Sequence, residues 1–205
     1  MIRSFRDREA ELVFNRRRSR RLPSNIQRAA LRKLLQIEAA TLLDIGGGIG
    51  AIQHELAREG VRQVIGVDAS TAYLEAARTE AERQGYADRA QYIHGDFVDI
   101  APNIEAADIV TLDRVLCCYH DMKTLVGLSA ARAGKIYGVV FPQDTWWMRV
   151  GFSVINAFQR LRRHPFRVFV HQTQAVDALL GEMGFEKCYH RHTLLWQVVV
   201  YERST

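Results

Sequence analysis

The spacing of apolar residues along the chain changes near residue 41. Before it, residues 7–16 and 24–38 carry apolar positions at helical spacing, and Ser24 is a suitable N-cap for the second helix. After it, short apolar runs alternate with helical patterns. We expect strands at residues 41–45, 63–67, 90–94, 107–112 and 135–141, and helices at residues 51–59, 72–84 and 123–133.

This alternation predicts crossover units, in which successive strands run parallel and helices cover both faces of the sheet. The end of the chain differs, because residues 185–190 and 193–201 are strand-like runs separated only by His190–His192. So short a connection predicts an antiparallel hairpin. The predicted fold class is therefore α/β, with a doubly wound, Rossmann-like, mostly parallel sheet and a C-terminal antiparallel hairpin.

Composition narrows the class of protein. The 205 residues, 48% of them hydrophobic and 25% charged, suffice for one mid-sized domain or for one domain with a short appendage. No apolar run approaches the roughly 18 residues of a membrane-spanning helix, and the first residues lack the apolar core of a signal peptide. Three cysteines, two of them adjacent, make neither a disulfide framework nor a CxxC metal pair. We expect a cytoplasmic protein without a metal site.

The basic charge is concentrated at the start of the chain. Residues 1–40 hold 11 Lys and Arg against 4 Asp and Glu, whereas the other residues hold 17 against 19. Such an asymmetry is typical either of solvated, arginine-rich helices or of an arm that contacts a polyanion such as nucleic acid. The sequence therefore leaves a nucleic-acid partner open without favouring it.

A glycine-rich turn, Asp44-Ile45-Gly46-Gly47-Gly48-Ile49-Gly50, joins the first predicted strand to the helix that follows. Glycines let the backbone turn sharply and approach a ligand without a Cβ in the way. In an open α/β sheet this turn lies at the carboxyl ends of the strands, where ligands bind. We therefore expect a ligand over this loop.

Acidic residues at the ends of successive strands indicate which ligand this is. Asp44 would repel a pyrophosphate, but it suits a cationic ammonium group, directly or through water. Asp68 ends the second strand, where a carboxylate accepts hydrogen bonds from both hydroxyls of a ribose. Asp96 and Phe97 follow the third strand, where an acid and an aromatic ring suit an adenine. A ligand with an ammonium group, a ribose and an adenine but no phosphate is S-adenosyl-L-methionine.

With these motifs, residues 41 to about 203 resemble a class I S-adenosylmethionine-dependent methyltransferase. They are also similar to small bacterial proteins grouped with magnesium-protoporphyrin O-methyltransferases, on the segments 46–53, 114–119, 146–147 and 195–198. The resemblance implies a seven-stranded sheet and an enzyme that uses S-adenosyl-L-methionine. The cofactor-binding residues expected from the motifs and the resemblance are Asp44, Gly46, Gly47, Gly48, Gly50, Asp68, Ala69, Ser70, Asp96, Phe97 and Asp113.

The first residues resemble a different family. Residues 1–43, including the segments 14–23 and 26–34, look like the N-terminal helices of HigB/RelE-type toxins, which are ribosome-dependent mRNA endonucleases. The likeness stops before the toxin's sheet and before the residues which that family uses on RNA. We therefore expect a basic, toxin-like helical segment at residues 1–40, without ribonuclease activity, and a methyltransferase domain at residues 41–205.

Methyl transfer from a sulfonium is an in-line displacement, so the protein mainly aligns the nucleophile, the methyl group and the sulfur. A base is required only where the nucleophile carries a proton, as a hydroxyl does. His120 is the preferred catalytic base and Tyr119 a contact to substrate or cofactor, with Asp144 and His171 as weaker candidates. We expect Cys117 and Cys118 to be small buried residues.

Residues 146–167 are too apolar for a plain surface helix and too short to span a bilayer. Three interpretations remain. The segment is a core helix packed on the sheet, a lid whose Trp146, Trp147 and Phe152 face a hydrophobic substrate, or an interfacial segment in peripheral contact with anionic lipid.

The predicted activity is O-methylation of a small, hydrophobic molecule. One alternative is an RNA-binding protein or RNA methyltransferase that uses the basic N-terminus, although Asp113-Arg114-Val115-Leu116 stands where many amino-group methyltransferases carry an Asn-Pro-Pro-aromatic loop. A less favoured alternative is an NAD(P)-dependent oxidoreductase. Gly46, Gly48 and Ala51 fit the dinucleotide spacing, but Asp44 would stand beside the pyrophosphate.

Overall fold

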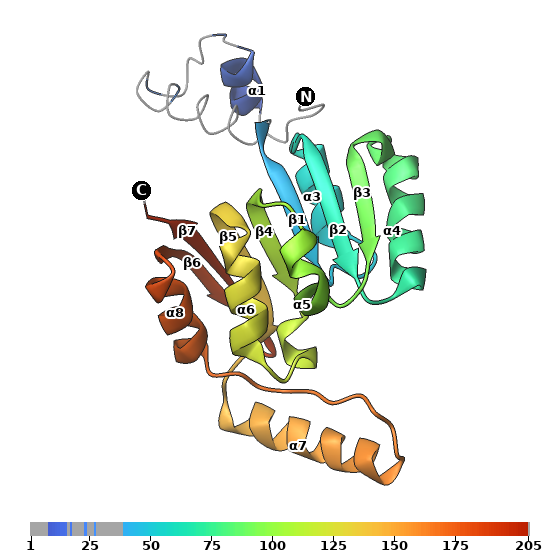
Figure 1. The fold of residues 1–205 in the computed structure, drawn as a ribbon. Helices are drawn as coiled ribbons and strands as arrows, with labels where there is room; N and C mark the ends of the chain where they lie inside the picture. Colours follow the sequence, from blue (N-terminus) through green and yellow to red (C-terminus); the bar gives the residue numbers. More distant parts are fainter. Residues whose placement is uncertain (1–7, 16, 18–22, 24–26, 28–38, 205) are drawn as a thin grey trace.

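The computed structural model describes residues 8–15, 17, 23, 27 and 39–204. A sheet of seven strands organises this part of the chain, in the order β3-β2-β1-β4-β5-β7-β6 (Figure 1). The strands are β1 Thr41–Ile45, β2 Gln63–Asp68, β3 Ala90–His94, β4 Ala107–Asp113, β5 Ala133–Pro142, β6 Phe185–His192 and β7 Trp196–Arg203. Strands β1 to β5 run parallel, and β7 runs antiparallel to both β5 and β6. The predicted fold class is confirmed.

The order of the strands reverses beside β1. The chain passes from β1 outward to β2 and β3, and then returns to β4 on the other side of β1. Crossover connections leave in opposite directions at such a point, so a crevice opens at the carboxyl ends of the strands. The glycine-rich turn after β1 lies at this crevice.

Helices cover both faces of the sheet, because neighbouring residues of β1 point to opposite sides. On one face Leu42 packs with residues of α3 (Ala51–Arg58) and α4 (Thr71–Gln84). On the other face Leu43 packs in the larger cluster with residues of α5 (Phe97–Ile100), α6 (Met122–Ala131) and α8 (Thr173–Glu182). The other helical elements are α1 Arg8–Phe14, η1 Ala87–Arg89, η2 Ala101–Asn103, η3 Leu116–Cys118 and α7 Trp146–Leu161.

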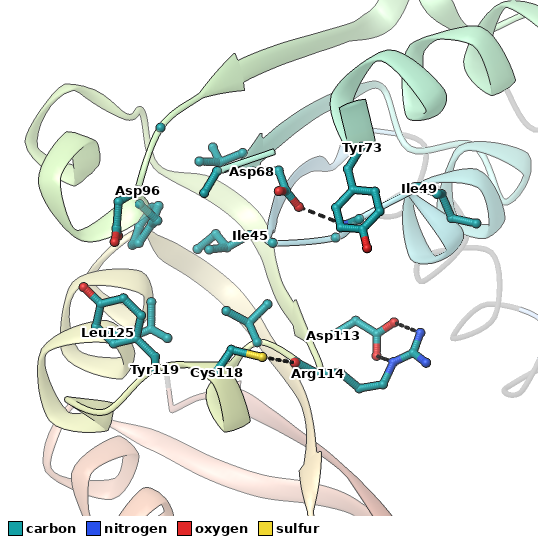
Figure 2. Close-up of a pocket in the computed structure, with 18 of the residues that line it drawn as sticks. Ile45, Ile49, Asp68, Tyr73, Asp96, Asp113, Arg114, Cys118, Tyr119 and Leu125 are labelled. Carbon is teal, nitrogen blue, oxygen red and sulfur yellow. Dashed lines mark hydrogen bonds and ion pairs between the residues drawn. The ribbon is translucent and has the colours of Figure 1, made fainter. Parts of the chain in front are cut away.

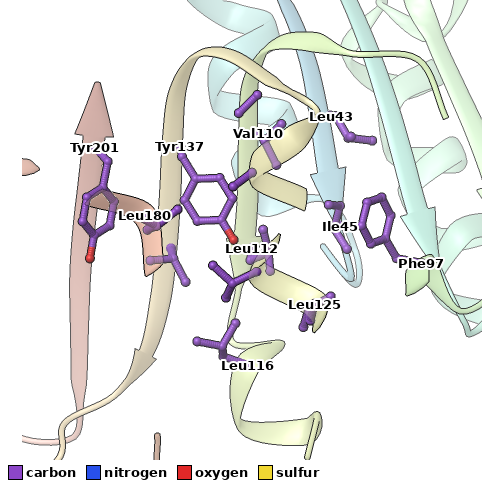
Figure 3. Packing of buried hydrophobic residues seen from close by; sticks show 14 of the residues in the cluster. Leu43, Ile45, Phe97, Val110, Leu112, Leu116, Leu125, Tyr137, Leu180 and Tyr201 are labelled. Atoms are coloured by element: carbon purple, nitrogen blue, oxygen red, sulfur yellow. The ribbon is translucent and has the colours of Figure 1, made fainter. Parts of the chain in front are cut away.

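The larger cluster fixes the strands that surround the crevice (Figure 3). Tyr137 of β5 is fully buried in it, with its ring beside those of Phe185 and Tyr201. Its hydroxyl lies 2.9 Å from Ser129 Oγ, so the buried polar group has a partner. A core with its polar groups satisfied holds the ends of β1, β4 and β5 in fixed positions.

In the C-terminal part, one expectation is wrong and one of the three interpretations of residues 146–167 is excluded. The turn of the hairpin lies at residues 193–195 and not at His190–His192, because Thr193 bonds Trp196 through its amide and its hydroxyl and closes the turn there. The segment at 146–161 is a helix, α7, but it is not a core helix. It lies beyond the carboxyl ends of the parallel strands, and Met148 is its one buried residue (Figure 1).

Other expectations at the N-terminus are tested only in part. The helix expected at residues 7–16 is present as α1. The helix expected at residues 24–38 lies outside the described residues apart from isolated positions, so the domain boundary at residue 40 stays a prediction. In the part of the chain that is described, no helix has both the length and the apolar character that a membrane crossing requires.

Candidate functional site

A cavity of about 660 Å³ opens at the carboxyl ends of β1, β2, β3 and β4 (Figure 2). It has the size of a site for a nucleoside-like ligand. Its lining comprises Ile45, Gly46, Gly47, Gly48, Ile49, Ala51, Val67, Asp68, Ala69, Tyr73, Gly95, Asp96, Phe97, Asp113, Arg114, Val115, Cys118, Tyr119 and Leu125. Most of the predicted site residues are among them. Asp44, Gly50, Ser70 and His120 are not.

The glycine-rich loop forms one wall of the cavity. Gly48 lines it with a φ of +57°, and Gly50 begins α3 with a φ of +82°. Both values lie in the left-handed region, where any residue with a Cβ is strained. The Gly46 amide donates to Val67 O at 2.6 Å and so fastens the start of the loop to β2. The loop therefore presents bare backbone to the cavity.

Asp68, at the end of β2, is held by two backbone amides. Gly48 N donates to Asp68 Oδ2 at 3.1 Å, and Ser70 N donates to Asp68 Oδ1 at 2.8 Å. A carboxylate offers about four acceptor positions, so these two bonds leave capacity for two further donors. Ser70 lies outside the lining and acts instead as the N-cap of α4, where its hydroxyl accepts from Tyr73 N.

Asp44 was expected to meet an ammonium group directly or through water, but it does not line the cavity. Its side chain is fully buried, accepting from Thr111 Oγ1 at 2.6 Å and from Gln53 Nε2 at 2.9 Å. Burial raises the pKa of Asp44 to about 6, although these hydrogen bonds favour its charged form. Asp44 therefore supports the loop from beneath.

Asp96 and Tyr119 stand on the wall opposite the glycine loop. Asp96 Oδ1 accepts from Val98 N at 3.0 Å as the N-cap of α5, which leaves its other oxygen for a ligand. Figure 2 shows the Tyr119 hydroxyl directed toward Asp96. Desolvation first, and then the nearby carboxylate of Asp96, raises the pKa of Tyr119, so its hydroxyl keeps its proton. Phe97 lines the cavity from within the core.

Asp113 and Arg114 place opposite charges side by side at the end of β4. The Arg114 guanidinium donates to both carboxylate oxygens of Asp113, at 3.1 and 3.0 Å (Figure 2). Arg114 has a φ of +59°, which is strained for a residue with a Cβ. Among the described residues that line the cavity, Arg114 is the one Lys or Arg. The cavity therefore carries more negative than positive side chains.

Three residues that shape the loop escaped the sequence analysis. Gln53 and Thr111 hold Asp44, as described above. His54 Nε2 donates to Ile49 O at 2.8 Å, while His54 Nδ1 accepts from the Tyr86 hydroxyl. Gln53 and His54 are the third and fourth residues of α3, and this proximity to the glycines is the one signal that could have identified them.

The candidate catalytic residues lie on the loop after β4. Tyr119 lines the cavity, but His120 does not; its ring stacks on Tyr119 and lies 6.5 Å, centroid to centroid, from Phe169. His171 is not placed as a base, because its Nε2 lies 2.9 Å from both Leu116 O and Tyr119 O and so carries a proton shared between two carbonyls. It fixes the loop instead.

The adjacent cysteines differ from the expectation that both are buried. Cys117 is buried, whereas Cys118 is exposed and lines the cavity. The two sulfur atoms lie 3.8 Å apart, and the hydrogen bond from Cys117 lowers the pKa of Cys118 to about 7. Cys118 is therefore the reactive thiol of the pair.

Comparisons with known proteins agree with this geometry. Residues 42–133 match the model of a methyltransferase domain family. None of the comparisons supports the expected resemblance of residues 1–43 to a toxin fragment. The match to a methyltransferase domain also gives no support to the alternative of an NAD(P)-dependent oxidoreductase.

Two curated relatives match about half of the chain. The ribosomal protein L11 methyltransferase of Dechloromonas aromatica (strain RCB) is 36% identical over 113 residues, which are 53% of this chain and 38% of the relative. The tRNA 5-carboxymethoxyuridine methyltransferase of Escherichia coli (strain K12) is 31% identical over 103 residues, 49% of this chain and 39% of the relative. The chain thus spans about two fifths of the length of these relatives.

A solved structure covers nearly the whole chain. The magnesium protoporphyrin IX methyltransferase from Synechocystis PCC 6803, crystallised with bound SAH, aligns with a TM-score of 0.68 over 96% of this chain and 93% of its own, at 18% identity. An identity this low establishes a shared fold only.

Proposed function

We propose that the protein, whose residues 42–133 match a methyltransferase domain, uses S-adenosyl-L-methionine as donor to methylate a small, apolar molecule. The observation that carries the proposal is the set of carboxylates Asp68, Asp96 and Asp113. They stand at the carboxyl ends of three strands and line one cavity beside the glycine loop.

The residues present fit this donor. Asp68 keeps two acceptor positions for the ribose hydroxyls, and the free oxygen of Asp96 suits the amino group of adenine. Asp113 and Arg114 offer a carboxylate and a guanidinium for the ammonium and carboxylate groups of the amino-acid part. The single cation of the described lining already pairs with Asp113, so the cavity is poorly suited to a pyrophosphate.

The donor supplies a methyl group on a positively charged sulfur, which leaves as a neutral thioether. The protein's part is alignment, and the rigid contacts of the loop and of Asp68 provide it. We assign Tyr119 to orienting the acceptor, because its protonated hydroxyl reaches the cavity. We assign His120, on the rim beside it, to accepting a proton where the acceptor is a hydroxyl, which makes O-methylation the proposed reaction.

Incubation of the protein with methyl-labelled donor and a cell extract tests the proposal. We expect a labelled product of low mass that partitions into organic solvent. The His120→Ala variant should form this product more slowly, whereas the His164→Ala variant, which changes an exposed histidine outside the cavity, should match wild type. Label found only in RNA or protein would contradict the proposed acceptor.

RNA is the second candidate acceptor, because one relative is a tRNA methyltransferase and residues 1–40 are rich in arginine. Contacts to phosphates release counterions, so RNA binding should weaken steeply as salt rises. A steep slope together with label in RNA would favour this function over the small molecule.

A further inference from the structure

Helix α7 presents an apolar stripe to solvent. Trp146, Val150, Val154, Phe158 and Leu161 recur every three or four residues, so they share one side of the helix. Their exposed fractions range from 52% for Phe158 to 81% for Leu161. We call these five residues the α7 stripe. Side chains of this size are rarely left together in water unless they meet a partner.

The opposite side of α7 holds the helix to the rest of the protein. Met148 is buried there, and Asn156 exchanges two hydrogen bonds with the backbone of Val168, at 2.7 and 2.9 Å. The chain around Val168 is joined in turn to the loop after β4, because Phe169 N donates to Cys117 O at 2.8 Å. The stripe is therefore directed outward, on a helix anchored beside the cavity.

The charged side chains of α7 and of the segment that follows it are all basic, and one of them, Arg149, pairs with Asp144 just before the helix. Residues 145–176 hold five arginines and no acidic residue, whereas the other residues of 41–205 hold 12 basic and 19 acidic residues. Arg160, Arg162 and Arg163 gather where α7 ends, and the Arg162 guanidinium lies 4.3 Å from the centre of the Phe158 ring. Cations thus adjoin the apolar residues directly.

From this combination we infer that the α7 stripe docks on a lipid bilayer that contains anionic lipids. Apolar side chains enter the boundary between headgroups and acyl chains, while the adjoining arginines bind the phosphates. Each arginine near an anionic surface strengthens binding by a factor of about five, and each buried apolar side chain adds to it.

Two other occupants fit the stripe less well. RNA would pair with the arginines but would leave Trp146, Val154 and Leu161 exposed. A second copy of α7 would add five more arginines to the same interface, and residues 145–176 have no acidic residue to offset them. Docking on lipid does not depend on the proposed function. If both hold, the membrane is the source of the apolar acceptor.

Vesicle co-sedimentation tests the inference with a matched pair of variants of the full chain. Leu161→Glu changes the stripe, and Leu194→Glu makes the same change at the tip of the hairpin, where the leucine is 77% exposed against 81% for Leu161. The vesicles contain phosphatidylcholine with or without about one third phosphatidylglycerol. We expect wild type and Leu194→Glu to pellet with the anionic vesicles, and Leu161→Glu to bind at least about tenfold more weakly.

Tryptophan fluorescence provides a second readout. Emission should shift to shorter wavelength with anionic vesicles, and brominated lipid should quench it, in wild type but not in Leu161→Glu. Equal binding by Leu161→Glu and wild type would overturn the inference and place the lipid contact elsewhere, for example on the arginine-rich residues 1–40. No binding by wild type, or light scattering that shows a dimer lost in Leu161→Glu, would overturn it too.

The binding of S-adenosylhomocysteine distinguishes a failure of the docking inference from a failure of the proposed function. The Leu161→Glu variant should bind this product with the affinity of wild type, which also shows that it folds. Vesicle binding without product binding would leave the docking inference standing and contradict the proposed function. Product binding without vesicle binding would contradict the docking inference and leave the proposed function standing.

Discussion

A Cβ atom placed on Gly47 would lie 1.9 Å from Asp44 Oδ2. The glycine loop thus closes directly on a buried carboxylate that Thr111 and Gln53 hold in place. Asp44 cannot move aside without losing these bonds. A residue with a Cβ at position 47 would therefore have to displace either Asp44 or the loop.

Replacement of Gly47 by Ala should therefore destabilise the protein by about 1–3 kcal/mol, the usual cost of overpacking. Urea unfolding measures the change. Gly181→Ala is the matched control, because a Cβ on Gly181 in α8 meets no atom within 4 Å and Ala favours a helix. The control should equal or exceed wild type in stability. If both variants lose the same free energy, the contact with Asp44 has no special role.

The raised pKa of Asp44 predicts a pH dependence of stability. In the unfolded chain the carboxyl ionises near its model value of 3.8, whereas in the folded protein its pKa is about 6. The folded state therefore binds the proton more tightly, so the free energy of unfolding falls as pH rises from about 4 to 6. The contribution is about 3 kcal/mol.

The Asp44→Asn variant isolates this contribution. Its amide can donate to Gln53 Oε1, a buried acceptor without a partner, once the Gln53 amide rotates. Relative to wild type, the variant should gain about 2.5 kcal/mol in free energy of unfolding between pH 4 and pH 7. Urea titrations of both proteins at several pH values measure the difference in their free energies of unfolding. The contributions of other titrating groups are the same in both proteins and cancel in this difference. A difference independent of pH would show that Asp44 titrates normally.

Loss of the Asp68 carboxylate should weaken the binding of S-adenosylhomocysteine by about 1.5–3 kcal/mol, since hydrogen bonds to a charged group are lost. Calorimetry of Asp68→Ala would then show an affinity roughly 10- to 150-fold lower. Asp88→Ala, which removes an exposed carboxylate in η1 outside the cavity lining, should bind like wild type. Equal affinities for the two variants would remove Asp68 from the site.

Cys118 reports directly on occupancy of the cavity. With a pKa of about 7 it is about half thiolate at neutral pH, so it should react readily with N-ethylmaleimide. Saturating S-adenosylhomocysteine should slow this reaction severalfold, while that of the exposed Cys188 on β6 should not change. Mass spectrometry of the labelled peptides compares the two. Equal slowing of both cysteines would indicate a general change and not a ligand in this cavity.

The sheet was predictable because each strand leaves a local pattern. Apolar runs such as residues 41–45 end at Gly or Asp, and Gly85 ends α4 with a φ of +72°. The hairpin turn was misplaced because Thr193 closes it through bonds to Trp196, and no local signal separates that turn from one at His190–His192. The sequence could not predict whether α7 is buried or exposed, because its apolar stripe fits a core helix and a surface helix equally well.

The site was predictable where a residue lies at the end of a strand, as Asp68 and Asp96 do. The role of Asp44 was not, because only the packing of Thr111 and Gln53 shows that its carboxylate lies beneath the loop. Cys118 was missed because its exposure depends on the short helix η3, which buries Cys117 and leaves its neighbour facing the cavity.

Calorimetric titration of the wild-type protein with S-adenosylhomocysteine, and separately with NAD⁺, tests the central claim most directly. A cavity with carboxylates at three strand ends should bind the phosphate-free nucleoside at one site per chain and give no heat with the dinucleotide. Saturable binding of NAD⁺ with none of S-adenosylhomocysteine would contradict the account.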